Sequence, residues 1–172
     1  MISVALTAGV SQARARESAD FDEFYSASVR GLTLQLYAYL GDLSEAQDVV
    51  HEAFARAFAR WKHISGYDEP VTWVRRVAWN LATNHFRKQR NALAFVHRQR
   101  TQHIEGPDPD RVALTRALAK LPPNHRRAVV LHYQAQLSVA EIAAQEGVAE
   151  GTVKSWLSRG RAALAAQLRG EN

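Results

Sequence analysis

The stretch from Ser138 to Leu164 constrains the fold of this 172-residue chain more than any other. Ser138 is followed three residues later by Glu141, which is the spacing of a capping box at the start of a helix. Gly147 then ends that helix, because glycine takes the left-handed backbone conformation without strain. A second helix is predicted from about Glu150. Together these residues predict a helix-turn-helix.

The second helix of this motif is predicted to have one apolar and one cationic face. Val153, Leu157 and Leu164 recur at helical spacing and are expected to face inward. A polar, cationic helix fits the major groove of DNA. The alternative to a DNA-binding motif is an ordinary helical hairpin within a helix bundle, whose arginines are simply exposed to solvent. The polar face consists of Lys154, Ser155, Ser158, Arg159 and Arg161.

Composition excludes several classes of protein. The chain contains no cysteine, which rules out disulfides and thiolate zinc sites and fits a reducing cytoplasm. No run of residues is long and apolar enough to span a membrane. We therefore expect a cytoplasmic protein that needs no cofactor and no metal. Residues 1–18 are expected to form a mobile tail.

Charge is distributed unevenly along the first half of a chain whose net charge is +5. Between Pro70 and Ile104 there are Arg and Lys residues but no Asp or Glu. This separation predicts one surface for a basic protein partner and another for nucleic acid. The acidic residues that precede the basic stretch are Asp42, Glu45, Asp48, Glu52, Asp68 and Glu69.

Hydrophobic periodicity predicts an all-α fold of two small helical domains. In the first domain, residues 19–91, helices are expected over 21–40, from a cap at Ser44 to about Trp61, and from about Val71 to Arg90. The sequence Gly-Pro-Asp-Pro-Asp at 106–110 cannot continue a helix, so a flexible linker is placed at 92–111. The second domain, residues 112–170, is expected to hold helices over 112–121 and 125–134 before the helix-turn-helix.

The third expected helix carries a face suited to single-stranded DNA. Asparagine can contact a base edge and Arg or Lys can hold phosphates. Trp73 and Trp79 are either aromatic surfaces for stacking on an unpaired base or part of the core. The residues that share the polar face are Arg76, Asn80, Asn84, Arg87 and Lys88.

Two motifs in register point to a known family. Residues 41–61 (GDLSEAQDVVHEAFARAFARW) and 72–90 (TWVRRVAWNLATNHFRKQR) resemble region 2 of bacterial extracytoplasmic-function sigma factors. Residues 118–164 (LAKLPPNHRRAVVLHYQAQLSVAEIAAQEGVAEGTVKSWLSRGRAAL) resemble region 4 of the same family. The resemblance implies a promoter-specificity subunit that binds core RNA polymerase, recognises the −35 and −10 elements and helps to melt the latter.

The resemblance also implies which residues meet the polymerase. Region 2 would dock on the β′ clamp helices and region 4 on the β flap. Gln47 and His51 depart from the family pattern of the clamp-binding helix. An anti-sigma factor is a further candidate partner and would cover the polymerase-binding faces. The residues expected to contact the clamp are Asp48, His51, Glu52 and Arg56.

Two further residue sets follow from the resemblance. The loop from His63 to Pro70 matches the family loop that captures a flipped −10 base, and Trp156 is either core or a contact to the DNA backbone. The expected −10 contacts are Tyr67, Asp68, Trp73, Arg76, Asn80, Asn84, Arg87 and Lys88. The expected −35 contacts are Thr152, Lys154, Ser155, Ser158, Arg159 and Arg161.

Other classes of protein have features that can be compared with this sequence. A stand-alone helix-turn-helix regulator would bind duplex DNA without polymerase. A small nuclease would need clustered carboxylates in a cleft, whereas the acidic residues here lie on amphipathic helices. His51-Glu52 lacks the second histidine at the spacing of a metalloprotease motif. A 20-residue linker reaches up to roughly 70 Å, enough for one chain to hold two DNA elements. The sequence therefore favours a non-enzymatic sigma factor.

Overall fold

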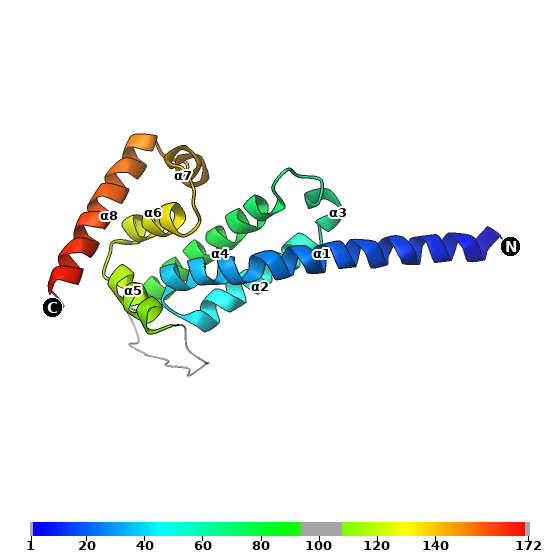
Figure 1. Ribbon diagram of the computed structural model, residues 1–172, viewed down its shortest axis with the longest axis horizontal. Coiled ribbons are helices and arrows are strands. Elements are labelled where there is room, and N and C mark those ends of the chain that lie inside the picture. The colour runs from blue at the N-terminus through cyan, green and yellow to red at the C-terminus, as the bar shows by residue number, and fades with distance from the viewer. Residues whose placement is uncertain (1, 94–107, 171–172) are drawn as a thin grey trace.

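The computed structural model describes residues 2–93 and 108–170, and within them every regular element is an α-helix (Figure 1). This confirms the all-α prediction. No helix in these two segments is both long and apolar enough to cross a membrane. The expected linker, residues 92–111, falls mostly on residues 94–107, which lie outside the described ones. The helices are α1 (Ile2–Leu40), α2 (Leu43–Phe58), α3 (Trp61–Ile64), α4 (Pro70–Leu93), α5 (Pro109–Ala119), α6 (Pro123–Tyr133), α7 (Val139–Glu146) and α8 (Glu150–Gly170).

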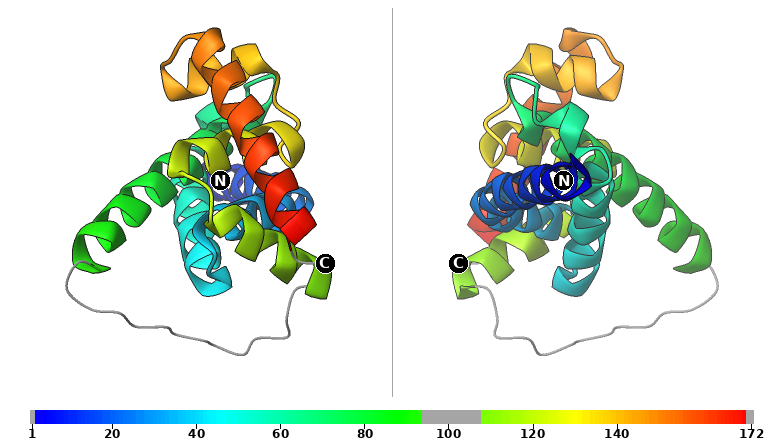
Figure 2. Two further views of the ribbon diagram at one scale, coloured as in Figure 1. Left: turned by 90° about the vertical axis from the view of Figure 1, so that its left-hand side faces the viewer. Right: turned by 90° about the vertical axis from the view of Figure 1, so that its right-hand side faces the viewer.

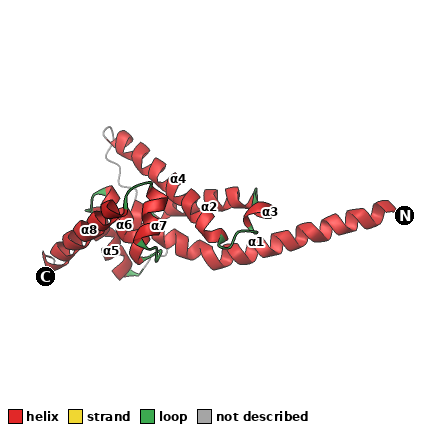
Figure 3. Cartoon of the chain, turned by 90° about the horizontal axis from the view of Figure 1, so that it is seen from above, coloured by secondary structure: helices red, strands yellow, loops and turns green. Residues whose placement is uncertain are grey.

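The N-terminus differs from the expected mobile tail, because α1 is continuous from Ile2 to Leu40. Residues 2–18 contain no proline and several strong helix formers, among them alanine, leucine, arginine and glutamine. The first part of α1 extends away from the other helices (Figures 1 and 3). The helix ends at Gly41, whose φ of 83° is left-handed and whose N–H donates to the carbonyl of Tyr37 at 2.8 Å.

In the first domain α1, α2 and α4 pack against one another, with the short α3 beside α1 and α2. The N-cap of α2 is Asp42 rather than the expected Ser44: the Asp42 carboxylate accepts from the N–H of Glu45 at 3.0 Å. Aspartate at this position satisfies an N–H that has no partner within the helix. The apolar stripe of α2 is buried and comprises Ala46, Val49, Val50, Ala53, Phe54 and Ala57.

An aromatic cluster joins α1 to α2 and α3. Phe21 of α1 meets Trp61 edge-on, with ring centroids 5.2 Å apart, and Phe24 stacks on the same indole at 4.9 Å. The ring centroid of Phe54 in α2 lies 5.7 Å from that of Phe24. Offset and edge-on contacts of this kind are favourable beyond the burial of area. The cluster therefore fixes the start of the folded core at Phe21.

Proline sets the starts of two helices in the second domain. α5 begins at Pro109 behind an N-cap at Asp108, and α6 begins at Pro123. Both helices start two or three residues earlier than expected, because proline is favoured in the first turn, where its missing N–H costs nothing.

The helix-turn-helix forms as predicted. The N–H of Glu141 donates to Ser138 Oγ at 3.2 Å and the N–H of Ser138 donates to Glu141 Oε2 at 2.8 Å, which completes the capping box. Gly147 ends α7 in the left-handed conformation at φ 67°. Ile142 and Val153 are fully buried between α7, α8 and their neighbours. These contacts fix the angle at which α8 leaves the turn.

The two domains are packed together. One continuous cluster of buried apolar residues includes members of both, such as Leu36 of α1 and Leu118 of α5. α1 contacts α5 and α6, while α4 lies behind them (Figures 1 and 2). The second domain therefore rests on the first through α1.

Replacing Ser138 with alanine should lower the free energy of unfolding by about 1 kcal/mol, because the N–H of Glu141 loses its acceptor. Urea denaturation followed by circular dichroism measures the change. Ser26→Ala, at an exposed position inside α1, is the matched control and should leave stability equal or slightly raised. Equal midpoints for Ser138→Ala and wild type would show that the cap does not stabilise the motif.

Candidate nucleic-acid interface

The exposed side of α2 carries the residues expected to meet a protein partner. Its buried stripe faces α1 and α4, so Asp48, His51, Glu52 and Arg56 all point to solvent. Glu52 and Arg56 pair at 2.8 Å one helical turn apart. Both side chains are half exposed, so this pair contributes little to stability and remains available to a partner.

The basic face of α4 is likewise exposed. Val74, Ala78 and Ala82 are buried, and the opposite side presents Arg76, Asn80, Asn84, Arg87 and Lys88 to solvent. Arg87 donates from Nη2 to Asn84 Oδ1 at 2.8 Å, which leaves the Asn84 NH₂ group outside this hydrogen bond. The structure therefore brings all five predicted residues onto one surface.

The two tryptophans of α4 have different environments. Trp79 is completely buried, with its ring 5.0 Å from Tyr39, so it belongs to the core and cannot stack on a base. Trp73 is only partly buried and packs against the edge of the core. Of the two aromatic surfaces considered from the sequence, Trp73 alone remains accessible.

The loop before α4 presents an aromatic and an acidic side chain. Tyr67 is 41% exposed, and its ring meets His63 edge-on at 5.3 Å. Asp68 is exposed beside it. At the end of the loop the hydroxyl of Thr72 donates to Glu69 Oε2 at 3.1 Å, which ties the loop to the first turn of α4. Tyr67 and Asp68 thus lie close in sequence to the start of the α4 face.

The cationic side of α8 points away from the core. Val153 and Leu157 are buried, whereas Lys154, Ser158 and Arg159 are exposed, as is Arg161. Thr152, Ser155 and Trp156 are partly buried, and Trp156 packs against the core. The predicted surface is therefore present, with its charged members outermost and Trp156 turned toward the interior.

Sequence reasoning missed Arg126 and Arg127 of α6, both of which are buried between the domains. Burial lowers the pKa of the Arg126 guanidinium, and the nearby Tyr39 opposes this effect. Burial likewise raises the pKa of the Glu146 carboxyl, which the Arg127 guanidinium partly offsets. The signal in the sequence was a pair of arginines beside the buried run Ala128–Leu131.

Within the part of the chain that the structure describes, no three His, Asp or Glu side chains are grouped so as to hold a metal ion. Of the acidic residues of α2, Asp48 and Glu52 are exposed on its solvent-facing side, and Glu45 Oε1 lies 3.7 Å from His85 Nε2 of α4. The described residues thus offer no support for the nuclease alternative.

Comparisons with known proteins agree with this geometry. The family models "Sigma-70 region 2" and "Sigma-70, region 4" match residues 24–92 and 111–164. The ECF RNA polymerase sigma factor SigL of Mycobacterium tuberculosis H37Rv is 33% identical over 158 residues, covering 87% of this chain and 89% of its own length. SigW of Bacillus subtilis is 30% identical over 168 residues, covering 88% of each chain.

The chain belongs to the extracytoplasmic-function sigma factors. Its function is promoter-specific initiation of transcription with RNA polymerase, as the sequence predicted. The alternative, a stand-alone helix-turn-helix regulator, is not favoured. Hereafter residues 24–92 and 111–164 are called region 2 and region 4.

Solved structures agree on the fold. The sigma factor RpoE of Bartonella quintana, crystallised with the anti-sigma factor NepR, superposes with a TM-score of 0.72 at 22% identity, over 89% of this chain and 99% of that one. CnrH, solved with the cytosolic domain of CnrY, superposes with a TM-score of 0.66 at 21% identity, over 94% and 96%. At these identities the likeness concerns the fold alone.

The position of α8 depends on a close contact at Gly160. A Cβ added there would lie 2.8 Å from Cγ2 of Val129, a buried side chain of α6. Gly160→Ala should therefore force α8 away from α6 and lower the free energy of unfolding by about 1–3 kcal/mol. Urea denaturation tests this.

The matched control is Gly151→Ala in the same helix, where an added Cβ meets nothing within 4 Å. This variant should be as stable as wild type or more so, by up to about 1 kcal/mol, because alanine favours a helix over glycine. If both variants had the same stability, the close packing of α6 on α8 would be contradicted.

Proposed function

We propose that this sigma factor uses three separate surfaces, one for polymerase and two for promoter DNA. The observation that supports the proposal most directly is the exposure of the charged members of all three residue sets on different segments: α2, α4 with its preceding loop, and α8. A chain with these surfaces can bind polymerase while each DNA-binding helix faces a different promoter element.

The α2 surface would bind the β′ clamp helices. Its exposed residues include two carboxylates, Asp48 and Glu52, which suit a basic partner. Arg56, paired to Glu52 at 2.8 Å, orients that carboxylate. His51 occupies the same exposed side. Region 4 would bind the β flap.

The loop and α4 would bind and melt the −10 element. Exposed arginine and lysine would hold phosphates, and Asn80 and Asn84 would read base edges. Tyr67 and the partly exposed Trp73 would supply aromatic surface for an unpaired base, a contact worth about 1–3 kcal/mol. Asp68 would accept hydrogen bonds from a base lifted out of the stack. Stabilising the open strand in this way favours melting.

The α8 surface would read the −35 element from the major groove. Lys154, Ser158 and Arg159 are exposed on one side of the helix, where they can reach phosphates and base edges. Thr152 and Ser155 lie at the margin of this surface, and Arg161 extends it toward the C-terminus. The chain would act without catalysing a reaction itself, in the cytoplasm beside the polymerase.

An anti-sigma factor is a further proposed partner. RpoE was solved with the anti-sigma factor NepR, and CnrH was solved with the cytosolic domain of CnrY. Such a partner would inhibit this chain most simply by covering the α2 surface, because polymerase could then no longer bind it.

Asp48→Ala should weaken binding to core polymerase and leave DNA preference unchanged, because the substitution removes a carboxylate from the α2 surface. A pull-down of the purified chain with the β′ clamp helices measures the loss. Asp22→Ala, an exposed carboxylate of α1, is the matched control and should bind as wild type. Equal recovery of both variants would remove α2 from the polymerase interface.

Arg159→Ala should weaken recognition of the −35 element by about 1–3 kcal/mol if Arg159 contacts a base. The measurement is transcription by the holoenzyme from templates with intact and altered −35 elements. Arg169→Ala, exposed in the last turn of α8, should retain wild-type selectivity. Selectivity unchanged in Arg159→Ala would show that this side chain reads no base.

A further inference from the structure

Two asparagines on the exposed face of α4 differ in their hydrogen bonding. Asn80 and Asn84 are about one helical turn apart, and both side chains are exposed. Asn84 Oδ1 accepts from Arg87 Nη2 at 2.8 Å, whereas the Asn80 side chain makes no hydrogen bond with any residue that the structure describes. Two residues of one type on one helix face therefore offer DNA different hydrogen-bonding groups.

The chemistry of the partner determines which side of the Asn84 amide is occupied. A guanidinium has N–H donors and no acceptor, so only the carbonyl oxygen of Asn84 can bond to Arg87. The NH₂ group of Asn84 takes no part in this bond and keeps its donors for another partner. Arg87 is exposed and forms no ion pair with a described residue, so its remaining N–H groups are also available. Together Asn84 and Arg87 offer mainly donors.

Guanine is the base whose major-groove edge best matches a set of donors. Its N7 and O6 atoms are both acceptors, whereas adenine and cytosine each present an amino group there, and thymine offers one acceptor beside a methyl group. An amino group of adenine or cytosine would face the N–H groups of Arg87, donor against donor. Guanine can instead accept from the NH₂ of Asn84 and from an N–H of Arg87 at once. These atoms stay on the edge of the base after the strands separate.

Asn80 favours a different base. Because neither side of its amide is occupied, it can accept from the amino group of adenine and donate to N7, which is the bidentate contact typical of asparagine. Residues four apart in a helix are displaced by about 6 Å along its axis, close to two base steps of about 3.4 Å. The two asparagines are therefore expected to reach bases no more than about two steps apart.

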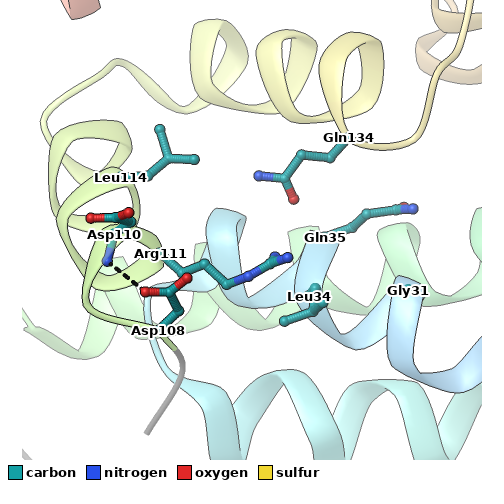
Figure 4. A pocket seen from close by; sticks show the side chains of 8 residues that line it. All are labelled: Gly31, Leu34, Gln35, Asp108, Asp110, Arg111, Leu114 and Gln134. Carbon is teal, nitrogen blue, oxygen red and sulfur yellow. Dashed lines mark hydrogen bonds between the residues drawn. The ribbon is translucent and has the colours of Figure 1, made fainter.

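The α4 face is separate from the hollow between α1 and α5. That hollow has a volume of 560 Å³ and is lined by residues of α1, by residues 108–114 at the start of α5, and by Gln134 after α6 (Figure 4). None of its lining residues belongs to α4. A base held there would not touch Asn80 or Asn84, so base identity at α4 depends on the hydrogen-bonding groups of its exposed side chains.

We propose that Asn84 and Arg87 together select guanine at one position of the −10 element, and that Asn80 selects adenine within about two positions of it. This inference rests on the proposed function, because it assumes that α4 faces the −10 element. Arg87 then does more than hold a phosphate, since its bond to Asn84 determines which base that asparagine reads. Without Arg87 the Asn84 amide has the same free groups as Asn80 and favours adenine as well.

The test measures base preference with the complete holoenzyme. A promoter that the wild-type holoenzyme transcribes is randomised over its −10 element, and each template carries a downstream barcode that is read from its transcript. Wild type should enrich guanine at one position and adenine close to it. Arg87→Ala should lower the guanine preference roughly tenfold and raise adenine at the same position. Asn80→Ala should lose the adenine preference and keep the preference for guanine.

Lys88→Ala is the matched control. Lys88 is an exposed cation that, like Arg87, lies within about one turn of Asn84, but it makes no hydrogen bond with that residue. The variant therefore loses the same charge as Arg87→Ala. It should transcribe less from all templates and keep the base preferences of wild type. Since all of the substituted side chains are exposed, the variants should fold, and circular dichroism checks their helicity.

A double variant separates joint reading from independent reading. If Asn84 and Arg87 bind one guanine together, each single substitution to alanine already breaks the shared contact. The loss of guanine preference in the double variant should then be smaller than the product of the two single losses. Losses that multiply would show two independent readers and would overturn the inference.

The remaining outcomes distinguish this inference from the proposed function. A guanine preference that survives in Arg87→Ala, or that falls equally in Lys88→Ala, would overturn the inference while Asn80→Ala and Asn84→Ala still identify α4 as a reader of the −10 element. Wild-type base preferences in Asn80→Ala, Asn84→Ala and Arg87→Ala alike would instead remove α4 from the −10 contact and contradict the proposed function itself.

Discussion

Burial of one apolar stripe on each main helix is the constraint on which the remaining structure depends. In α2 the stripe from Ala46 to Ala57 faces the core, and in α8 Val153 and Leu157 do the same. A helix that buries one side against the core exposes its opposite side to solvent. The polar residues of α2, α4 and α8 therefore form exposed surfaces as a direct result of this burial. The same packing sets the directions in which those surfaces point.

The elements that sequence could predict are those determined by local physics. The capping box at Ser138 and the left-handed turn at Gly147 depend on a few neighbouring residues, and both form as expected. Helical periodicity also predicts that Asn80 and Arg159 face away from the core, and both side chains are exposed in the structure. Membership of the family followed from two motifs in register, and relatives of known function agree with it.

What the sequence could not predict depends on distant contacts. Trp79 and Trp73 are the same residue type on the same helix, and the contact of Trp79 with Tyr39 of α1, which the sequence does not show, accompanies the burial of the first. Asp42 and Ser44 are both good caps, and the exact start of α2 decides between them. Arg126 donates to a carbonyl 87 residues away in sequence, so its place beside an apolar run could mark it as unusual but could not identify that partner. The contact between regions is therefore a product of tertiary structure.

The central claim is that this chain directs polymerase to promoters with two spaced elements. Run-off transcription with core polymerase on a genomic library, with and without the chain, tests it most directly, and the region upstream of its own gene is the first template. The claim predicts new transcripts that require both components and whose start sites share two sequence motifs at a constant spacing. A chain that protects duplex DNA without polymerase and adds no transcripts to those of core enzyme would contradict it.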